Sequence, residues 1–247
     1  MSFPVRFRRE LPAGVCVAVS LPEGDGFAMP PALHPDEAAF VFASPAPRRA
    51  SFIGGRVALR TAMAALGADA GQVGDAAPAL PILSTPRGAP ALPSGYVGSV
   101  SHKRELAVAI VARAEPTPRT TIGIDVEIPR PLRTDIATRV LTDDERAALA
   151  GLDPAARDAE VLFRFAAKEA IYKALDPWVQ RLVSFQEVEL ATAPDGSRRA
   201  RLDLKGGEGP FRVDVYDIGA LDGEEHDAVE AVNDLVLVVA TVTPEKK

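Results

Sequence analysis

Two acidic residues stand two apart in a short apolar segment, Gly123-Ile124-Asp125-Val126-Glu127. In a β-strand, side chains two residues apart point to the same face, so Asp125 and Glu127 would face the same way. Mg²⁺ accepts carboxylate oxygens together with waters and substrate phosphates. The segment is therefore a candidate part of a metal site, although exposed acids at a strand end would give the same pattern.

More charged residues lie on a segment whose apolar residues recur with helical periodicity over 163–175. Glu169 and Lys173, four apart, share a row beside the apolar stripe, and Lys168 lies about 100° around the helix from Glu169. Glu169 and Lys173 could form an ordinary surface ion pair. Alternatively, Glu169 could be a third carboxylate for the metal, with Lys173 as a cation near a phosphate.

The first half of the chain supplies candidate phosphate ligands, because a guanidinium binds phosphate as a two-pronged donor. These arginines are Arg48, Arg56, Arg60 and Arg87. Ser101 and His102 add a hydroxyl and an imidazole just before an apolar run at 106–112. For His102, capping a turn is an equal alternative.

Charge is distributed unevenly over the 247 residues, whose net charge is −6. The first 119 residues carry 12 Lys and Arg against 9 Asp and Glu, and the rest carry 16 against 25. This favours an anionic ligand for the first part and a cation for the second. The basic residues are scattered and the pI is about 5.2, so we expect no nucleic-acid partner.

Composition indicates a globular protein of one large or two small domains, with 47% apolar and 25% charged residues. The single cysteine, Cys16, cannot form an intramolecular disulfide, which fits the cytoplasm. The longest apolar runs, 106–112 and 235–242, are too short to span a bilayer, so we expect no membrane span. We predict a β-strand at 14–21 rather than a secretory signal, because a turn follows it.

Periodicity and turn residues predict the remaining elements. Helices are expected from Pro35, over 48–66, from a capping box at Thr142 to Glu145, and over 158–175; strands over 106–112, 121–128, 185–190, 199–204, 211–216 and 235–242; and a long loop over 68–93. A weak repeat pairs Arg56 and Arg60, followed by the strand at 106–112, with Glu169 and Lys173, followed by the strand at 235–242. It suggests two similar α+β halves with a ligand in the cleft between them.

Together these motifs resemble a known family. The segment 123–127, followed by Phe165-Ala166-Ala167-Lys168-Glu169-Ala170-Ile171-Tyr172-Lys173, is similar to the paired signature of the 4′-phosphopantetheinyl transferases. Motifs at 48–56, 87–90 and 98–102 resemble the surfactin-type branch, particularly its enterobactin synthetase component D group. Short-form carrier synthases of the family are half this length and trimeric, so the length favours the monomeric branch.

The resemblance implies an α+β pseudo-dimer of two similar α/β halves, with a coenzyme A half at 1–119 and a Mg²⁺-binding, catalytic half at 120–247. It implies a cytoplasmic enzyme that moves the 4′-phosphopantetheine arm of coenzyme A to a serine of an apo acyl or peptidyl carrier protein, as in secondary-metabolite and siderophore biosynthesis. Adenosine 3′,5′-bisphosphate would be released.

The resemblance also assigns roles to residues. Asp125, Glu127 and Glu169 would bind the metal; Glu169, Lys173 and Asp125 would be catalytic, with Glu169 favoured over Glu127 as general base. Lys168 and Lys173 would lie near the transferring phosphate. Coenzyme A would be held by Arg48, Arg56, Arg87, Ser101 and His102. Lys103 stands where many members have cysteine and could add a phosphate contact.

Two rival functions are weaker. A catalytically inactive coenzyme A or nucleotide-binding module would keep the arginines and lose acids, yet all three acids are present. Another Mg²⁺-dependent phosphotransferase would show a glycine-rich phosphate loop, which the sequence lacks.

We expect the carrier protein to dock near the helix at 158–175 and the segment 176–182, which contains several apolar residues. Trp178 in this segment is either a core residue or an anchor for the carrier.

Overall fold

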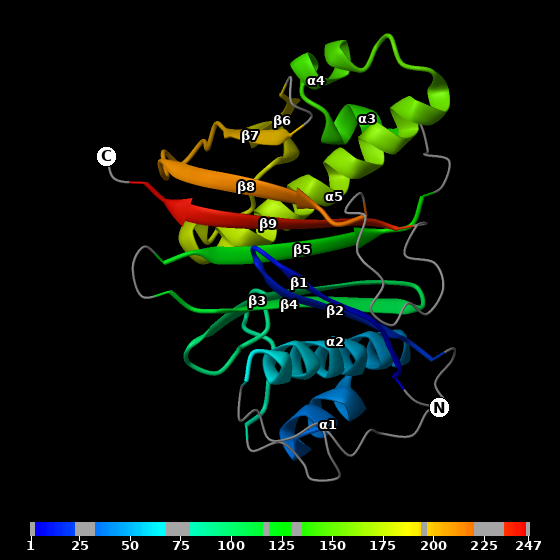
Figure 1. The fold of residues 1–247 in the computed structure, drawn as a ribbon, viewed down its shortest axis with the longest axis vertical. Helices are drawn as coiled ribbons and strands as arrows, with labels where there is room; N and C mark the ends of the chain where they lie inside the picture. Colours follow the sequence, from blue (N-terminus) through cyan, green and yellow to red (C-terminus); the bar gives the residue numbers. More distant parts are fainter. Residues whose placement is uncertain are drawn as a thin grey trace. The chain divides into compact units, whose positions relative to one another are not determined.

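The computed structural model describes residues 3–22, 33–67, 80–115, 119–129, 135–193, 197–219 and 235–245. These residues form two compact units, the first ending at Glu115 and the second containing the described residues from 119 onward. Each unit has one antiparallel sheet and one long helix (Figure 1). The predicted fold class, α+β with two similar α/β halves, is confirmed in this respect.

The sheet of the first unit has four antiparallel strands in the order β1-β2-β4-β3. They are β1 (Val5–Leu11), β2 (Gly14–Ser20), β3 (Tyr96–Lys103) and β4 (Leu106–Arg113). β2 and β4 are the central strands and are almost entirely buried. The single cysteine, Cys16, lies in β2 as a fully buried free thiol. The strand predicted at 14–21 is thus confirmed.

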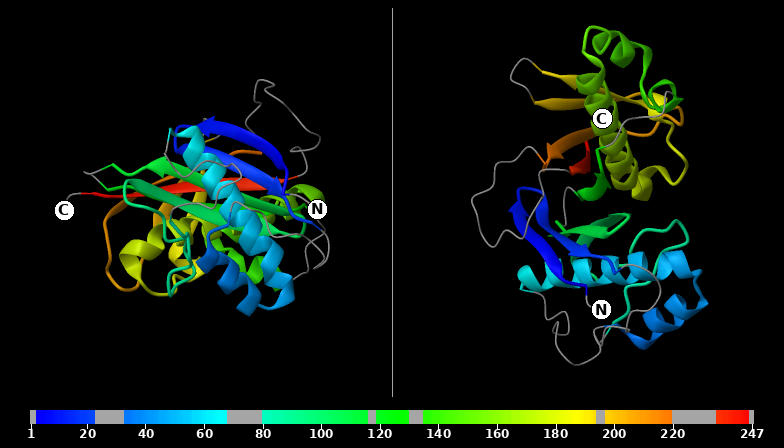
Figure 2. Two further views of the ribbon diagram at one scale, coloured as in Figure 1. Left: turned by 90° about the horizontal axis from the view of Figure 1, so that it is seen from below. Right: turned by 90° about the vertical axis from the view of Figure 1, so that its right-hand side faces the viewer.

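Two helices complete the first unit, α1 (Pro35–Ala43) and α2 (Ala46–Ala65). α2 lies across one face of the sheet, and α1 packs on the side of α2 that faces away from the sheet (Figure 2). The core between α2 and the sheet contains Ile53, Leu59 and Met63 from the helix and Val17 and Ala109 from the strands. A Cβ atom at Gly54 would lie 3.2 Å from Cβ of Ala107 in β4 and 2.2 Å from the end of the Leu21 side chain, so glycine eases the close packing of α2 on the sheet.

The second unit has a five-stranded antiparallel sheet in the order β5-β9-β8-β7-β6. The strands are β5 (Thr121–Glu127), β6 (Val188–Thr192), β7 (Arg198–Leu202), β8 (Phe211–Asp217) and β9 (Val236–Pro244). Every residue of β5 is buried, including Asp125 and Glu127, so the acids are not exposed strand-end residues.

A long helix, α5 (Pro154–Val179), packs against β5, β9 and β8. It starts four residues before the predicted helix, because Asp153 caps its first amides and Pro154 suits a first helical position. The short helices α3 (Asp135–Val140) and α4 (Asp143–Ala148) precede it, and the 3₁₀ turn η1 (Phe185–Glu187) follows it. The capping box from Thr142 to Glu145 forms as predicted.

The structure differs from the sequence predictions in several places, including strand β1 and helix α3, which were not predicted. Residues 96–103, where no strand was predicted, form edge strand β3, since their backbone pairs with β4 despite small and polar side chains. The strand predicted at 185–190 begins as the turn η1, because Ser184 caps it. The predicted loop at 68–93 lies partly outside the described residues; its described part, 80–93, contains an isolated bridge between Ser84 and Pro90.

Among the helices that the structure describes, none has the length and apolar character needed to cross a membrane.

Candidate active site

Helix α5 lies directly against strand β5, and Gly123 permits this contact. A Cβ atom at position 123 would collide with the carbonyl oxygen of Ala170 and would lie 2.8 Å from the amide nitrogen of Ala174. Two residues earlier, the hydroxyl of Thr121 donates a 2.6 Å hydrogen bond to the carbonyl oxygen of Ala174. The close approach brings the Glu169 and Lys173 row of α5 to the acids of β5.

Lys173 connects the helix to the strand through its ammonium group. Its Nζ donates hydrogen bonds of 2.8 Å to the carbonyl oxygen of Ile124 and of 2.8 Å to Oδ1 of Asp125. The Lys173 side chain is 27% exposed and the Asp125 side chain 8%, so the pair lies at the edge of solvent. This leaves Lys173 available as a cation for a bound anion.

Glu169, one turn before Lys173, is half-buried and lies in the field of the other acids. Burial raises the pKa of Glu169; Asp125 and Glu127 raise it further, and Lys173 opposes them. A carboxylate with a raised pKa is a better proton acceptor than an ordinary surface acid. The structure thus brings together Asp125, Glu127, Glu169 and Lys173, which the sequence had placed in separate motifs.

The chemistry of these donors fits Mg²⁺. Asp125, Glu127 and Glu169 offer carboxylate oxygens, and Mg²⁺ commonly takes one or two carboxylates and completes its shell with waters and substrate phosphates. Within the described ranges, no three His, Cys, Asp or Glu side chains are grouped tightly enough to enclose a metal unaided. A metal bound here would therefore need further ligands besides these side chains.

A small cavity of about 130 Å³ adjoins Glu169. One wall is α5 and the other is the chain that follows it; the lining residues are Lys168, Glu169, Tyr172, Leu182, Val183, Ser184, Phe185 and Val188. Sites that enclose a whole small molecule usually measure about 300–1,000 Å³, so this one has room for only part of a substrate.

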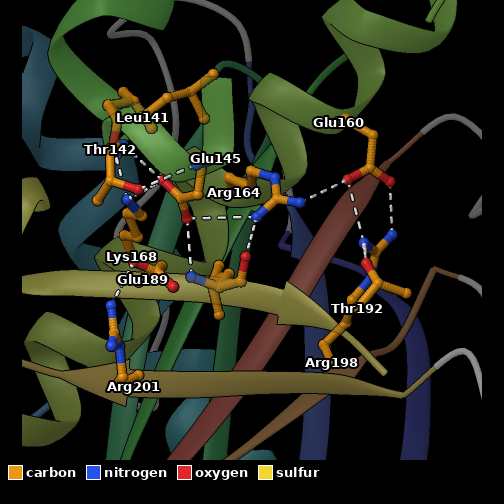
Figure 3. Close-up of polar contacts among 12 residues, drawn as sticks. Leu141, Thr142, Glu145, Glu160, Arg164, Lys168, Glu189, Thr192, Arg198 and Arg201 are labelled. Carbon is orange, nitrogen blue, oxygen red and sulfur yellow. Dashed lines mark hydrogen bonds and ion pairs between the residues drawn. The ribbon is translucent and has the colours of Figure 1, made fainter. Parts of the chain in front are cut away.

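The ammonium group of Lys168 points to Glu145 (Figure 3). It is 1% exposed, and its Nζ donates to the carbonyl oxygens of Val140 at 2.7 Å and Phe185 at 3.0 Å and to Oε2 of Glu145 at 2.6 Å. An ammonium group has three N–H donors, and all three have protein partners here. The structure therefore gives Lys168 a different place from the phosphate contact that the resemblance implied.

Arg56 is also engaged within the protein. It is 4% exposed; its Nε donates 2.7 Å to the carbonyl oxygen of Ile82, and its Nη2 donates 3.1 Å to Oγ of Ser84. Its guanidinium lies 3.8 Å from the ring centroid of Phe52. Burial lowers the pKa of Arg56 to about 10, an effect that Glu37 opposes and Arg60 reinforces. Arg56 thus ties α2 to the segment that leads to Arg87.

The other residues predicted to hold coenzyme A lie at separate places in the first unit. Arg48 is exposed in the first turn of α2, and Arg87 is exposed in the turn closed by the hydrogen bond from Gly88 to Thr85. Ser101 and His102 are consecutive in β3, Ser101 buried and His102 exposed. Arg60 is buried and bound to Glu37 at 2.7 Å, so it too has a protein partner.

Sequence reasoning missed the importance of Glu37 and Glu145, which are both buried. Glu145 accepts hydrogen bonds from Arg164, Lys168 and the amide of Leu190 (Figure 3). The capping-box spacing identified the helix start, and a capping glutamate followed by a buried helix with an arginine was the available signal.

Trp178 has the contacts of a core residue. Its Nε1 donates a 2.8 Å hydrogen bond to Oγ1 of Thr121, its ring lies 6.3 Å from that of Phe211, and Arg119 lies over it at 5.4 Å. These contacts favour the core alternative, and the exposed apolar side chain nearby is Leu182, at 81%.

Comparisons with known proteins place these features in a family. Residues 121–230 match the model of the 4′-phosphopantetheinyl transferase superfamily, and residues 36–112 match that of the 4′-phosphopantetheinyl transferase N-terminal domain. A structure of holo-ACP-synthase from Plasmodium yoelii aligns with 51% of this chain and 94% of its own, at 19% identity and a TM-score of 0.39.

Curated relatives align over most of the chain. The 4′-phosphopantetheinyl transferase Svp of Streptomyces mobaraensis is 38% identical over 178 residues, 70% of this chain and 67% of the relative. The 4′-phosphopantetheinyl transferase PptT of Mycobacterium tuberculosis is 32% identical over 170 residues, 68% of this chain and 70% of the relative. The chain therefore belongs to the 4′-phosphopantetheinyl transferase superfamily.

Proposed function

We propose that this protein transfers the 4′-phosphopantetheine group of coenzyme A to a serine of an apo acyl or peptidyl carrier protein and releases adenosine 3′,5′-bisphosphate. Family membership supports the reaction class. The observation that carries the proposal is the cluster of Asp125, Glu127, Glu169 and Lys173. It brings three carboxylates close to a cation, and the pKa of one of them, Glu169, is raised.

In the proposed step, the serine oxygen attacks the β-phosphorus of coenzyme A, and the bond to the bridging oxygen of the diphosphate breaks. The serine proton goes to a carboxylate, for which Glu169 is favoured because burial and neighbouring acids raise its pKa. Lys173 offsets the negative charge that grows on the leaving bridging oxygen. Glu127, buried in β5, is the alternative proton acceptor.

A Mg²⁺ ion held by Asp125, Glu127 and Glu169 would neutralise the diphosphate when bound. The three side chains supply oxygen ligands of the kind this ion prefers.

For coenzyme A binding, we propose direct contacts from Arg48, Arg87, Ser101 and His102, with Lys103 as a further phosphate contact. Arg56 would act mainly by holding the segment that carries Arg87, since two of its nitrogens already bind Ile82 and Ser84. The coenzyme A half would then be residues 1–119 and the catalytic half 120–247.

For the carrier protein, we propose docking beside the end of α5, where Leu182 is exposed next to the cavity at Glu169. We further propose that the chain belongs to the surfactin-type branch, because of its N-terminal motifs, and that it is a monomer, because of its length. A cytoplasmic location is supported by the one cysteine being a buried free thiol. Size-exclusion chromatography with light scattering tests the monomer.

The test of the function is incubation with coenzyme A, Mg²⁺ and a panel of apo-carriers, read by intact mass spectrometry of the carrier. The wild-type protein should add one phosphopantetheine arm. Glu169→Gln and Asp125→Asn should each lower the rate by about 10²–10⁴-fold, the usual contribution of a positioned acid or base or of a charge-stabilising group.

Glu160→Gln is the matched control. Glu160 also lies on α5, but its partners are Arg198 and Arg164 and it lies outside the acidic cluster. Its substitution should leave transfer within about threefold, since the glutamine oxygen can still accept a hydrogen bond and Arg164 keeps its contact with Glu145. Wild-type protein that modifies no carrier in the panel, or a Glu169→Gln variant as active as Glu160→Gln, would contradict the proposed function.

A further inference from the structure

Lys168 joins three separate elements to α5. Its acceptors are the last residue of α3, Val140, the first turn of α4 through Glu145, and the turn η1 through the carbonyl oxygen of Phe185. Lys168 is only 1% exposed, and its ammonium group faces protein acceptors although the residue also lines the cavity beside Glu169. Breaking such a buried, fully paired set of contacts leaves unpaired polar groups behind.

The turn that Lys168 holds is one wall of the cavity beside Glu169. Phe185 lines this cavity from η1, while Glu169 and Tyr172 line it from α5. The wall has a second tether, because Nε2 of Gln186 donates to the carbonyl oxygen of Leu141 at 3.0 Å and of Arg139 at 3.2 Å. Both tethers connect η1 to the end of α3, so both control the same wall.

We propose that Lys168 is a positioning residue for the transfer reaction: it fixes the Phe185 turn and so sets the width of the cavity beside Glu169, while its ammonium group binds protein acceptors and not the substrate. This inference rests on the proposed function. It differs from a phosphate contact, because the three donors of Lys168 are already in use.

The position of Lys168 in the chain explains how it can hold the Phe185 turn and also affect Glu169. It precedes Glu169 directly, so its side chain points to the α3 and η1 side while Glu169 faces the acids of β5. Displacing a reacting group by about 1 Å can lower a rate about 10²-fold. A wall that moves toward or away from Glu169 is therefore enough to change the reaction.

The first experiment measures amide hydrogen exchange without substrate, in wild type and in Lys168→Met, which keeps the apolar length of the side chain. The amides of Gln186 and Glu187, which bond to Ser184, report on the turn. We expect them to exchange at least about tenfold faster in the variant, while β5 and β9 keep wild-type protection.

The second experiment separates positioning from phosphate binding. The Lys168→Met variant should lose about 10–100-fold in kcat/KM for transfer, as expected for a displaced reacting group. Its affinity for adenosine 3′-phosphate 5′-diphosphate, which contains the transferring phosphate but lacks the pantetheine arm, should stay within about twofold of wild type. A direct phosphate contact would instead weaken the binding of this nucleotide and leave the exchange of the turn unchanged, and that result would overturn the proposal.

Gln186→Ala keeps the test decisive if Lys168→Met does not fold, since Gln186 is exposed and tethers the same turn. It should produce the same selective exchange and a smaller loss of about threefold in kcat/KM, with nucleotide affinity unchanged. If the turn amides of the Gln186→Ala variant exchanged as in wild type, or if exchange became faster throughout the second unit, the proposed tether of the turn would be rejected. Absence of transfer by the wild type would count against the proposed function. The exchange result does not depend on transfer and tests only whether Lys168 and Gln186 hold the turn.

Discussion

Each unit of the molecule contains a buried glutamate that starts one helix and binds the long helix of the same unit. In the first unit Glu37 accepts hydrogen bonds from the amide of His34, from Arg60 and from the amide of Ile82. In the second, Glu145 accepts them from the amide of Thr142, from Arg164 and from the amide of Leu190. We call Glu37 and Glu145 the bridging glutamates.

The two bridging glutamates differ by one cation. One turn after Arg164 stands Lys168, which also binds Glu145, whereas one turn after Arg60 stands Ala64. Arg60 therefore corresponds to Arg164, and not to Lys173 as the weak sequence repeat suggested. The added lysine directly precedes Glu169, so in the second unit the contact of the bridging glutamate reaches the residue next to the candidate active site.

Replacing the bridging glutamate of the second unit should have the largest effect. Glu145→Ala leaves Arg164 and Lys168 buried without their carboxylate, and we expect a loss of about 3–5 kcal/mol in the free energy of unfolding of that unit. The single tryptophan, Trp178, lies in the second unit, so its fluorescence during urea unfolding reports this change. A loss below about 1 kcal/mol would show that the glutamate is not the main partner of these cations.

The corresponding change in the first unit should be smaller and confined to it. Glu37→Ala leaves Arg60 without its carboxylate, and we expect a loss of about 2–4 kcal/mol, since one cation rather than two loses its partner. Circular dichroism should show an earlier transition while the Trp178 fluorescence midpoint stays close to wild type. A fluorescence midpoint that moves as far as in Glu145→Ala would contradict independent stabilisation of the two units.

Trp178 should stabilise the second unit and leave carrier recognition to Leu182. Trp178→Ala removes its packing on Phe211 and its hydrogen bond to Thr121, and we expect a loss of about 2–3 kcal/mol because the ring is only partly buried. Thermal unfolding followed by circular dichroism measures it. The matched variant Leu182→Ser should keep the wild-type melting temperature and raise KM for the carrier; the reverse pattern would assign docking to Trp178.

The smallest effect concerns a third capping glutamate, Glu187, at η1. Hydrogen bonds from Arg181 lower the pKa of Glu187 from 4.5 to about 2, with help from the amides of Lys205 and Ser184 and against the effect of burial. Its contribution to stability is thus complete above about pH 4.5 and is lost as the pH falls toward 2. Melting temperatures of wild type and Glu187→Gln should therefore converge between pH 4.5 and 2.5. A constant difference over that range would exclude this titration.

For the second unit, the sequence identified residues that lie together in the structure, but it did not predict the contacts of Lys168. Period-two and helical spacing identified Asp125, Glu127, Glu169 and Lys173, and the structure brings them together because Gly123 lets α5 meet β5. Helical spacing could not tell that Lys168 points into the protein, since a lysine at the edge of an apolar stripe is normally exposed. That outcome depends on acceptors from α3, α4 and η1, which are distant in sequence.

In the first unit, sequence-based prediction failed for different reasons. An arginine pair four apart on a helix reads as a surface feature, yet Arg56 and Arg60 are buried because Glu37 and the segment at 80–84 cover them. Strand β3 escaped prediction because Gly98, Ser99 and Ser101 have low strand propensity, and pairing with the apolar strand β4 overrides it.

The burial of Cys16 has a practical consequence for following the reaction. The phosphopantetheine arm ends in a thiol, and the enzyme's own thiol is fully enclosed in β2 with its pKa raised by burial to about 12. At neutral pH almost none of it is thiolate, the form that alkylating reagents attack. A maleimide dye, added in excess over the thiol of coenzyme A and followed by separation of the proteins on a gel, should therefore label the newly modified carrier and not the folded enzyme. Labelling of the enzyme itself would then indicate that the first unit has unfolded.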